Sequence, residues 1–275
     1  MQIFEIFTEK NRVLLKAMVA TDFKLRYQQS FLGYIWSVLK PLLLFSVMYL
    51  VFIRFLKFGA DVPHFSVGLL LGITMWNFFV ETTSGAMSSV VVHGDLMRKI
   101  NFSKFVVVIS AGMSALINFG INFIVVIIFA LINGVQPSWW GLLIFPLVIE
   151  LFVLSLGVGF YLGALYVTFR DLSPIWEVVI QAGFYATPII YPVSLVATNL
   201  GPHYGPLLSR LILLNPLAQI VQDARHILIA PQNPIIWESF SNPLIKLIPV
   251  IICVLFFVGG ITYFSSKSNK FAELV

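Results

Sequence analysis

The sequence predicts an all-α integral membrane protein with an N-terminal amphipathic interface helix, six transmembrane helices and short re-entrant helices between the fifth and sixth spans. Of its 275 residues, 59% are hydrophobic and only 11% are charged, whereas a soluble domain typically carries about 25% charged residues. The apolar residues gather in six blocks, and roughly 20 helical residues are needed to cross a bilayer core of about 30 Å. Each block is continuous rather than alternating, which favours helices over a membrane β-barrel.

The six apolar blocks are the predicted spans. They cover residues 35–55, 65–80, 105–132, 142–169, 175–191 and 244–264.

The segment before the first span, within residues 1–30, reads as an amphipathic helix. Apolar residues recur between the charges with an imperfect 3.6-residue rhythm. They are Ile3, Phe4, Ile6, Phe7, Val13, Leu14, Ala17, Met18 and Leu25. Such a helix can lie in the membrane interface with its apolar side among the headgroups. A plain surface anchor and a partner-docking helix both fit this pattern.

Residues 84–104, between the second and third spans, form a short polar and basic segment. It is too long for a tight turn, and its helix-compatible residues are bounded by Gly94 and Ser103. We expect a short helix that lies across the cytoplasmic membrane surface.

The fifth span is expected to end at Thr187-Pro-Ile-Ile-Tyr-Pro192, because two prolines four residues apart kink or end a helix. Residues 193–214 follow, apolar but broken by Gly201-Pro202 and Gly205-Pro206. The pieces between these breaks are each too short to cross the membrane. We therefore predict re-entrant helices on the outer side, where protein or water must cover the irregular backbone.

Basic residues indicate the orientation. Most lie before the first span, between spans two and three, after span four or after the last span. They are Lys10, Arg12, Lys16, Lys24, Arg26, Arg98, Lys99, Lys104, Arg170, Lys267 and Lys270. By the positive-inside rule, both termini should be on the cytoplasmic side of the cytoplasmic membrane. Anionic lipid explains a pI near 9.3 without any nucleic acid.

No pattern for catalysis, metal binding or nucleotide binding occurs in the sequence. It has no phosphate-binding loop, no zinc-protease or serine-hydrolase motif, and a single cysteine, Cys253. Charges that can fall within spans are few, namely Lys40, Glu81, Glu150 and Glu177. Because ion-coupled carriers usually keep ionisable groups at mid-membrane, this argues against a proton-coupled pump.

Aromatic residues are abundant, with 26 Phe, 9 Tyr and 6 Trp. Interfacial belts account for many of them. Others lie in the apolar blocks or at their ends, where their flat rings can stack on sugars along a translocation path. The candidates for that path are Trp36, Trp76, Phe79, Phe184, Tyr185 and Tyr191. The same rings can instead pack helices together or face lipid, and the sequence leaves both interpretations open.

Several motifs occur along the chain in a fixed order. They are TDFKLRYQQSFLGYIWSVLKP at 21–41, WNFFVE at 76–81, DLMRKINFSK at 95–104, FRDL at 169–172, TPIIYP at 187–192 and LNPL at 214–217. In this order they resemble the ABC-2 type permease subunits of transporters that export polysaccharides such as O antigen, capsule or teichoic acid. One departure is Ser103, which stands where the family usually has proline and affects only the local turn.

The resemblance implies that residues 1–275 form a single transmembrane domain that works as a homodimer with two separate ATP-binding subunits. Those partners would bind ATP and magnesium, so no cofactor is expected in this chain. The substrate would be a polyprenyl-diphosphate-linked polysaccharide. The other contacts of the chain would be membrane lipids, with no nucleic acid.

The resemblance also implies roles for particular residues. Segment 84–104 would contain the coupling helix that docks in the ATPase, with Gly94, Asp95, Arg98 and Lys99 as the contact residues. Asp22, Arg26 and Tyr27 would form the elbow between the interface helix and the first span. Segment 193–214 would surround the outer mouth.

Two other classes of function remain open. An ABC permease of the same broad group can export a drug or a small lipid instead of a glycan. A stand-alone channel or secondary carrier would transport without an ATPase, and it would need mid-membrane ionisable groups that are scarce here. A membrane glycosyltransferase is disfavoured, because no cluster of carboxylates or histidines is available to activate a donor.

Overall fold

The computed structural model describes residues 8–27, 33 and 35–271, and this part of the chain is helical without any strand. The first half comprises α1 (Glu9–Tyr27), α2 (Ile35–Met48) with its π-helical continuation η2 (Tyr49–Phe55), α3 (Phe65–Val92), α4 (Gly94–Lys99) and α5 (Phe105–Ile132). The second half comprises the 3₁₀ segment η3 (Trp139–Leu143), α6 (Ile144–Tyr166), α7 (Leu172–Ala186), α8 (Val193–Asn199), α9 (Gly201–Ile212), α10 (Pro216–Leu228), α11 (Ile236–Ser239), α12 (Pro243–Lys246) and α13 (Ile248–Ser268).

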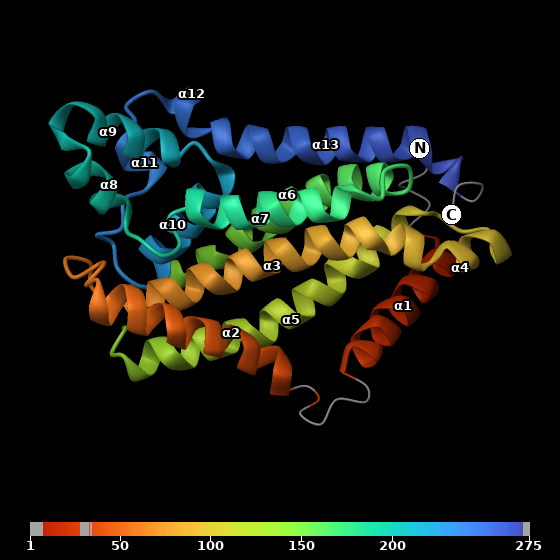
Figure 1. The fold of residues 1–275 in the computed structure, drawn as a ribbon, viewed down its shortest axis with the longest axis horizontal. Coiled ribbons are helices and arrows are strands. Elements are labelled where there is room, and N and C mark those ends of the chain that lie inside the picture. Colours follow the sequence, from red (N-terminus) through yellow and green to blue (C-terminus); the bar gives the residue numbers. More distant parts are fainter. Residues whose placement is uncertain (1–7, 28–32, 34, 272–275) are drawn as a thin grey trace.

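The long helices run along one common axis of the molecule (Figure 1). Helices α1 and α4 and the end of α13 gather at one extremity, which we call the α4 end. Helices α8, α9, α11 and α12 gather at the opposite extremity, which we call the α9 end. The described part of the chain therefore begins and ends near the same extremity.

Among the described residues, five helical segments are long and apolar enough to cross a membrane. They are Ile35–Phe55, Phe65–Val92, Phe105–Ile132, Trp139–Tyr166 and Ile248–Ser268. The predicted class, an all-α integral membrane protein, is thereby confirmed. The fifth predicted span forms α7, which has only 15 residues. At 1.5 Å per residue α7 is about 22 Å long, shorter than a bilayer core of about 30 Å.

Helix α3 continues well past the predicted end of the second span at residue 80. Its polar second half stays helical because hydroxyl groups donate back to carbonyls of the preceding turn, as Thr83 Oγ1 does to Phe79 O at 2.8 Å. The small residues of this half also let α6 approach closely. A Cβ added to Gly159 of α6 would lie 2.7 Å from Ala86 Cβ. Residues 84–92 are therefore part of a membrane-length helix, and α4 alone forms the separate short helix predicted in segment 84–104.

Close approach of helices through glycine also joins α6 to α13. A Cβ added to Gly157 would lie 2.6 Å from the backbone nitrogen of Phe257, so no larger residue fits there. Small residues at helix contacts are typical of membrane bundles, where dispersion rather than the hydrophobic effect holds helices together.

The predicted break at Gly201-Pro202 is present, since Gly201 adopts a φ of 74° between α8 and α9. The second Gly-Pro pair does not break the chain and lies inside α9. The reason is the packing of α9 on α8. Gly205 lies against the backbone of Ala197, so this glycine serves a helix contact rather than a turn.

The side chain of Arg225 on α10 joins three segments at the α9 end. It is 1% exposed, and its guanidinium donates from Nε to Gly68 O (3.0 Å), from Nη1 to Pro188 O (2.7 Å) and from Nη2 to Ile189 O (2.6 Å). Gly68 and Gly72 leave room for it, because a Cβ on either would lie within 3.3 Å of its nitrogens. Arg225 thus links α10 to the first turns of α3 and to the irregular chain after α7.

Replacing this arginine should destabilise the fold. In Arg225→Met, three buried carbonyls lose their donor, and we expect the free energy of unfolding to fall by about 3 kcal/mol or more. Arg225→Lys should recover only part of the loss, since one ammonium does not reproduce the planar donor geometry. Thermal unfolding in detergent would measure this, with Arg210→Met on exposed α9 as the control. Equal midpoints for both methionine variants would contradict the prediction.

Candidate functional site

Helix α4 lies on the surface of the α4 end with its charged side outward. Asp95, Arg98 and Lys99 are exposed, whereas Gly94 and Met97 are buried. Of the four residues predicted to contact a partner, three are therefore accessible and Gly94 is buried. Acidic Asp95 stands in the first turn and the two basic residues in the last, which suits the helix dipole.

A surface cleft of about 440 Å³ borders α4 and the chain that follows it. Its lining runs along one stretch of chain and consists of Met97, Arg98, Lys99, Ile100, Asn101, Phe102 and Lys104. Met97 and Phe102 are buried and form the apolar floor, while the charged residues stand at the rim. This combination of an apolar floor with a charged rim is typical of a surface that receives a side chain from another protein.

Helix α1 contacts the chain both just before and just after α4. Near its start, Lys10 Nζ donates to Asn101 O (2.7 Å), and Asn11 Oδ1 accepts from the backbone nitrogen of Ser103 (3.4 Å). Near its end, Asp22 Oδ1 lies 3.7 Å from Nε2 of His93, the residue just before α4. Any displacement of α4 must therefore also involve α1.

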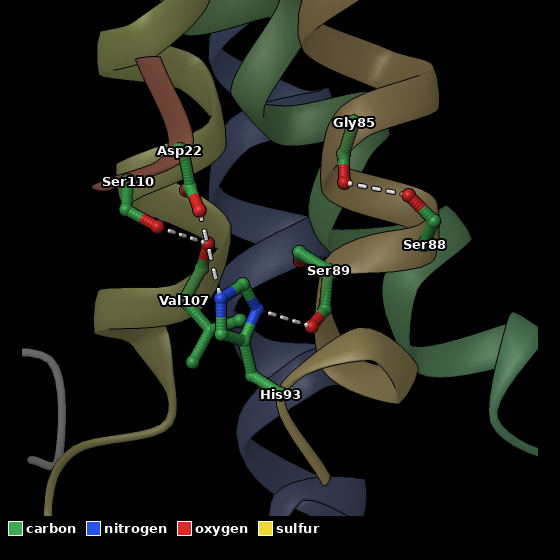
Figure 2. Close-up of polar contacts among 7 residues, drawn as sticks. All are labelled: Asp22, Gly85, Ser88, Ser89, His93, Val107 and Ser110. Carbon is green, nitrogen blue, oxygen red and sulfur yellow. Dashed lines mark hydrogen bonds and ion pairs between the residues drawn. The ribbon is translucent and has the colours of Figure 1, made fainter. Parts of the chain in front are cut away.

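His93 occupies the corner between α3 and α4 (Figure 2). Its Nδ1 lies 3.0 Å from Ser89 O, and its Nε2 faces Asp22 of α1. The nearby carboxylate of Asp22 raises the pKa of His93, although partial burial opposes this rise. A protonated imidazole can donate to both neighbours at once, so acidic conditions strengthen the contacts of His93 with Ser89 and Asp22.

The elbow predicted from the sequence is described only in part. Asp22 makes the contact with His93. Arg26 and Tyr27 stand in the last turn of α1, but their side chains lie outside the described residues.

The aromatic residues predicted to line the path differ in their exposure. Trp76 and Phe79 are buried with ring centroids 5.7 Å apart, and Phe184 of α7 lies 5.8 Å from Trp76, so these three rings pack α3 against α7. Trp36 of α2 is 46% exposed and Tyr185 of α7 is 59% exposed.

The remaining member of the set, Tyr191, is half-buried. Its hydroxyl donates to Tyr185 O at 3.1 Å.

A polar groove of about 550 Å³ lies between α2, α3 and α5, three helices of the candidate membrane spans. Its polar lining consists of Ser37, Lys40, Asn77, Glu81, Ser84 and Asn118, with Trp36 at the side. Asn118 Nδ2 donates to Glu81 Oε2 (2.7 Å), and Asn122 Nδ2 donates to Asn118 O (2.9 Å). We call this cleft the polar groove.

Sequence reasoning included Trp36 and left Glu81 without a role, and it missed the two asparagines. The available signal was their spacing. Asn118 and Asn122 lie four residues apart in an otherwise apolar run, so they share one helix face. Polar residues that face inward in a membrane helix usually belong to a functional site.

The chain is similar in sequence to known transporter proteins. The family described as ABC-2 type transporter matches residues 13–227. An O-antigen export system permease protein, RfbA, of Myxococcus xanthus is 28% identical over 265 residues, which cover 96% of each chain. Two Klebsiella pneumoniae proteins with the same name are 27% and 26% identical over 272 and 271 residues, covering 95% of each chain.

The contact between α1 and the α3–α4 corner should depend on pH. Because the pKa of His93 is raised above 6.5, its attraction to Asp22 is complete below that value and is lost as the pH rises through the raised pKa. We expect amide-exchange protection factors of α1 to fall about two- to fivefold between pH 5.5 and pH 8.5. In His93→Asn this pH dependence should vanish, while His64→Asn, at the opposite extremity, should retain it. An unchanged pH dependence in His93→Asn would exclude this ion pair as the cause.

Proposed function

We propose that this chain, which belongs to the ABC-2 type transporter family, is the membrane permease of an ATP-driven exporter of a polyprenyl-diphosphate-linked polysaccharide, of the O-antigen type. The observation that carries the proposal is similarity along nearly the whole chain to relatives named O-antigen export permeases. Capsule and teichoic acid polymers share the chemistry of lipid-linked glycans and belong to the same proposal. ATP hydrolysis takes place in two separate partner subunits, and two copies of this chain form the permease.

The α4 end is the proposed docking site for the ATPase. The exposed charges of α4 and the adjoining cleft supply its contacts. When the two ATPase subunits close on ATP, they push on α4, which is continuous with the corner at His93 and leads into α5 at Phe105. Because α1 contacts both sides of this segment, the interface helix moves with it. Transport then requires two states of the path, each favoured by a different nucleotide state.

The proposed path lies on the side of α3 where α2 and α7 flank it. The polar groove offers hydrogen-bonding groups to sugar hydroxyls, while Trp36 and Tyr185 expose rings on which sugars can slide. A second copy that faces this side would enclose a passage with both kinds of surface. Such a lining suits a long glycan, since it provides no single tight site at which the polymer would stop.

The proposed membrane topology has six crossings, with both termini on the cytoplasmic side. Helix α7 makes the fifth crossing together with the non-helical residues 187–191, which extend its reach toward the outer surface. The α4 end, rich in basic residues, is cytoplasmic. Helices α8 and α9 form the re-entrant pair at the outer mouth, and α1 lies along the inner membrane surface.

The docking site is tested by Asp95→Ala together with Arg98→Ala. Affinity purification of the unmodified chain from its native membrane should bring a stoichiometric ATPase with it. In the double variant we expect that partner to be lost, or its ATP hydrolysis to become independent of the permease, while the permease stays in the membrane. The matched control is Arg54→Ala together with Asp61→Ala, two exposed charges at the opposite extremity. Normal export by the Asp95 and Arg98 variant would exclude α4 as the docking site.

The path is tested by Trp36→Ala. We expect polymer export to fall at least about fivefold, because stacking of a flat ring on one aromatic side chain contributes roughly 1–3 kcal/mol. ATPase binding should stay unchanged. Trp139→Ala serves as the control, since Trp139 is also exposed but lies far from the polar groove.

Polymer export can be followed as lipid-linked glycan that reaches the outer leaflet of vesicles. If the reconstituted transporter moved a drug or a short lipid but no polymer, it would instead be the exporter of small molecules.

A further inference from the structure

A large cavity lies at the α9 end, away from both the polar groove and the α4 cleft. It has a volume of about 820 Å³ and lies between η3, the start of α6, α10 and the chain that leads to α11. Trp140 and Trp237 stand on its wall, with Asp223 and His226 of α10 between apolar residues such as Leu147 and Ile235. We call it the outer pocket. Nothing in the proposed transport cycle uses it.

Asp223 is the distinctive group of the outer pocket. It is only 6% exposed, and while its Oδ2 accepts from Gln219 Nε2 (2.6 Å), its Oδ1 has no hydrogen-bond partner. Within the part of the chain that the structure describes, no ion pair reaches this carboxylate. A buried carboxylate without a counter-charge is costly, so a ligand that completes it gains free energy.

No neighbouring side chain in the described part of the chain forms a direct ion pair with Asp223. Arg225 directs its guanidinium to three carbonyls on the other side of α10. His226 points Nδ1 at Asn233 O (2.9 Å). Glu150 of α6 lies close enough to interact electrostatically with Asp223, so a second carboxyl group adjoins this location. The outer pocket therefore favours a cation.

The two tryptophans favour the same kind of ligand. An indole face attracts ammonium groups, and a carboxylate beside aromatic rings is the usual arrangement for binding them. Trp237 already has one such contact, since Lys246 Nζ lies 5.9 Å from its ring centroid. A neutral sugar would stack on the rings without balancing the charge of Asp223, and a phosphate group would be repelled by it.

The location of the outer pocket indicates that the ammonium belongs to a lipid. Next to the pocket, an apolar groove of about 620 Å³ runs along the spanning helices α5 and α6, lined by residues such as Phe123, Ile127 and Phe145. Ser138 and Leu228 line both spaces. Lys246 lies next to Trp237. When the ammonium group of a lipid points into the outer pocket, Lys246 can pair with the phosphate of the same lipid.

We propose that the outer pocket binds the headgroup of an ethanolamine phospholipid, with Asp223 as the counter-ion of the ammonium, Trp140 and Trp237 beside it, and an acyl chain in the adjoining groove. This inference does not depend on which polymer the transporter exports. A lipid held there would pack η3 and α10 together and would stabilise the irregular chain at the α9 end.

Native mass spectrometry of the full-length permease in detergent, titrated with dioleoyl phosphatidylethanolamine, tests the proposal. Asp223→Asn should weaken binding about tenfold or more, as expected for loss of a charged hydrogen bond. Glu238→Gln, which removes an exposed carboxylate next to Trp237, should leave binding unchanged. Phosphatidylglycerol, which has no ammonium group, should bind weakly and equally to the unmodified protein and to both variants.

A second experiment uses only the unmodified protein, so a variant that fails to fold cannot mask the result. The unmodified protein should bind the lipid with an N-acetylated headgroup about tenfold more weakly, because acetylation removes the charge but keeps the acyl chains. Equal binding of both lipids would overturn the proposal. Soluble phosphoethanolamine that bound as tightly as the lipid would overturn the role of the groove. A neutral oligosaccharide that bound in an Asp223-dependent manner, without competition from the lipid, would assign the pocket to a glycan instead.

Discussion

The buried guanidinium of Arg225 is the interaction on which the α9 end depends. In a membrane protein every backbone carbonyl must find a donor within the protein, and the chain after α7 leaves the helix where water is scarce. Arg225 satisfies Pro188 and Ile189 there and Gly68 at the start of α3. Because it fixes α10 in this way, the opposite side of the same helix presents Asp223 and His226 to the outer pocket. One buried charge thus organises both the irregular chain and the cavity beside it.

Helix α3 connects the two extremities of the molecule. Its first turns accept a hydrogen bond from Arg225 at Gly68, and the residue that follows its last turn, His93, contacts Asp22 of α1. Between them, one side of α3 packs against α7 and another borders the polar groove. A push on α4 is therefore applied directly to the helix that lines the proposed path. This continuity gives a physical route for coupling, since a packed helix moves as a rigid body rather than bending at each turn.

Several parts of the fold were accessible from the sequence because they follow from local chemistry. Hydrophobic length alone located five of the six predicted spans, and the Gly201-Pro202 pair located the break between α8 and α9. The end of the second span was misjudged, since Glu81 and the hydroxyl residues after it interrupt the apolar run. The structure keeps them helical, because the hydroxyls bond within α3 and Asn118 donates to Glu81. Contacts of this kind join residues far apart in sequence and leave no local signal.

The sequence by itself determined the class of protein, five of the six predicted spans, the charged face of α4 and the resemblance to polysaccharide permeases. Length, composition and short motifs are properties of neighbouring residues. Only the tertiary structure decided which aromatic rings are exposed, how Asn118 meets Glu81, why Arg225 is buried and where Asp223 is left without a partner. In each of these cases the decisive quantity is the distance between side chains on different helices. Hydropathy does not encode that distance, which is set by how glycines such as Gly157 let the helices approach.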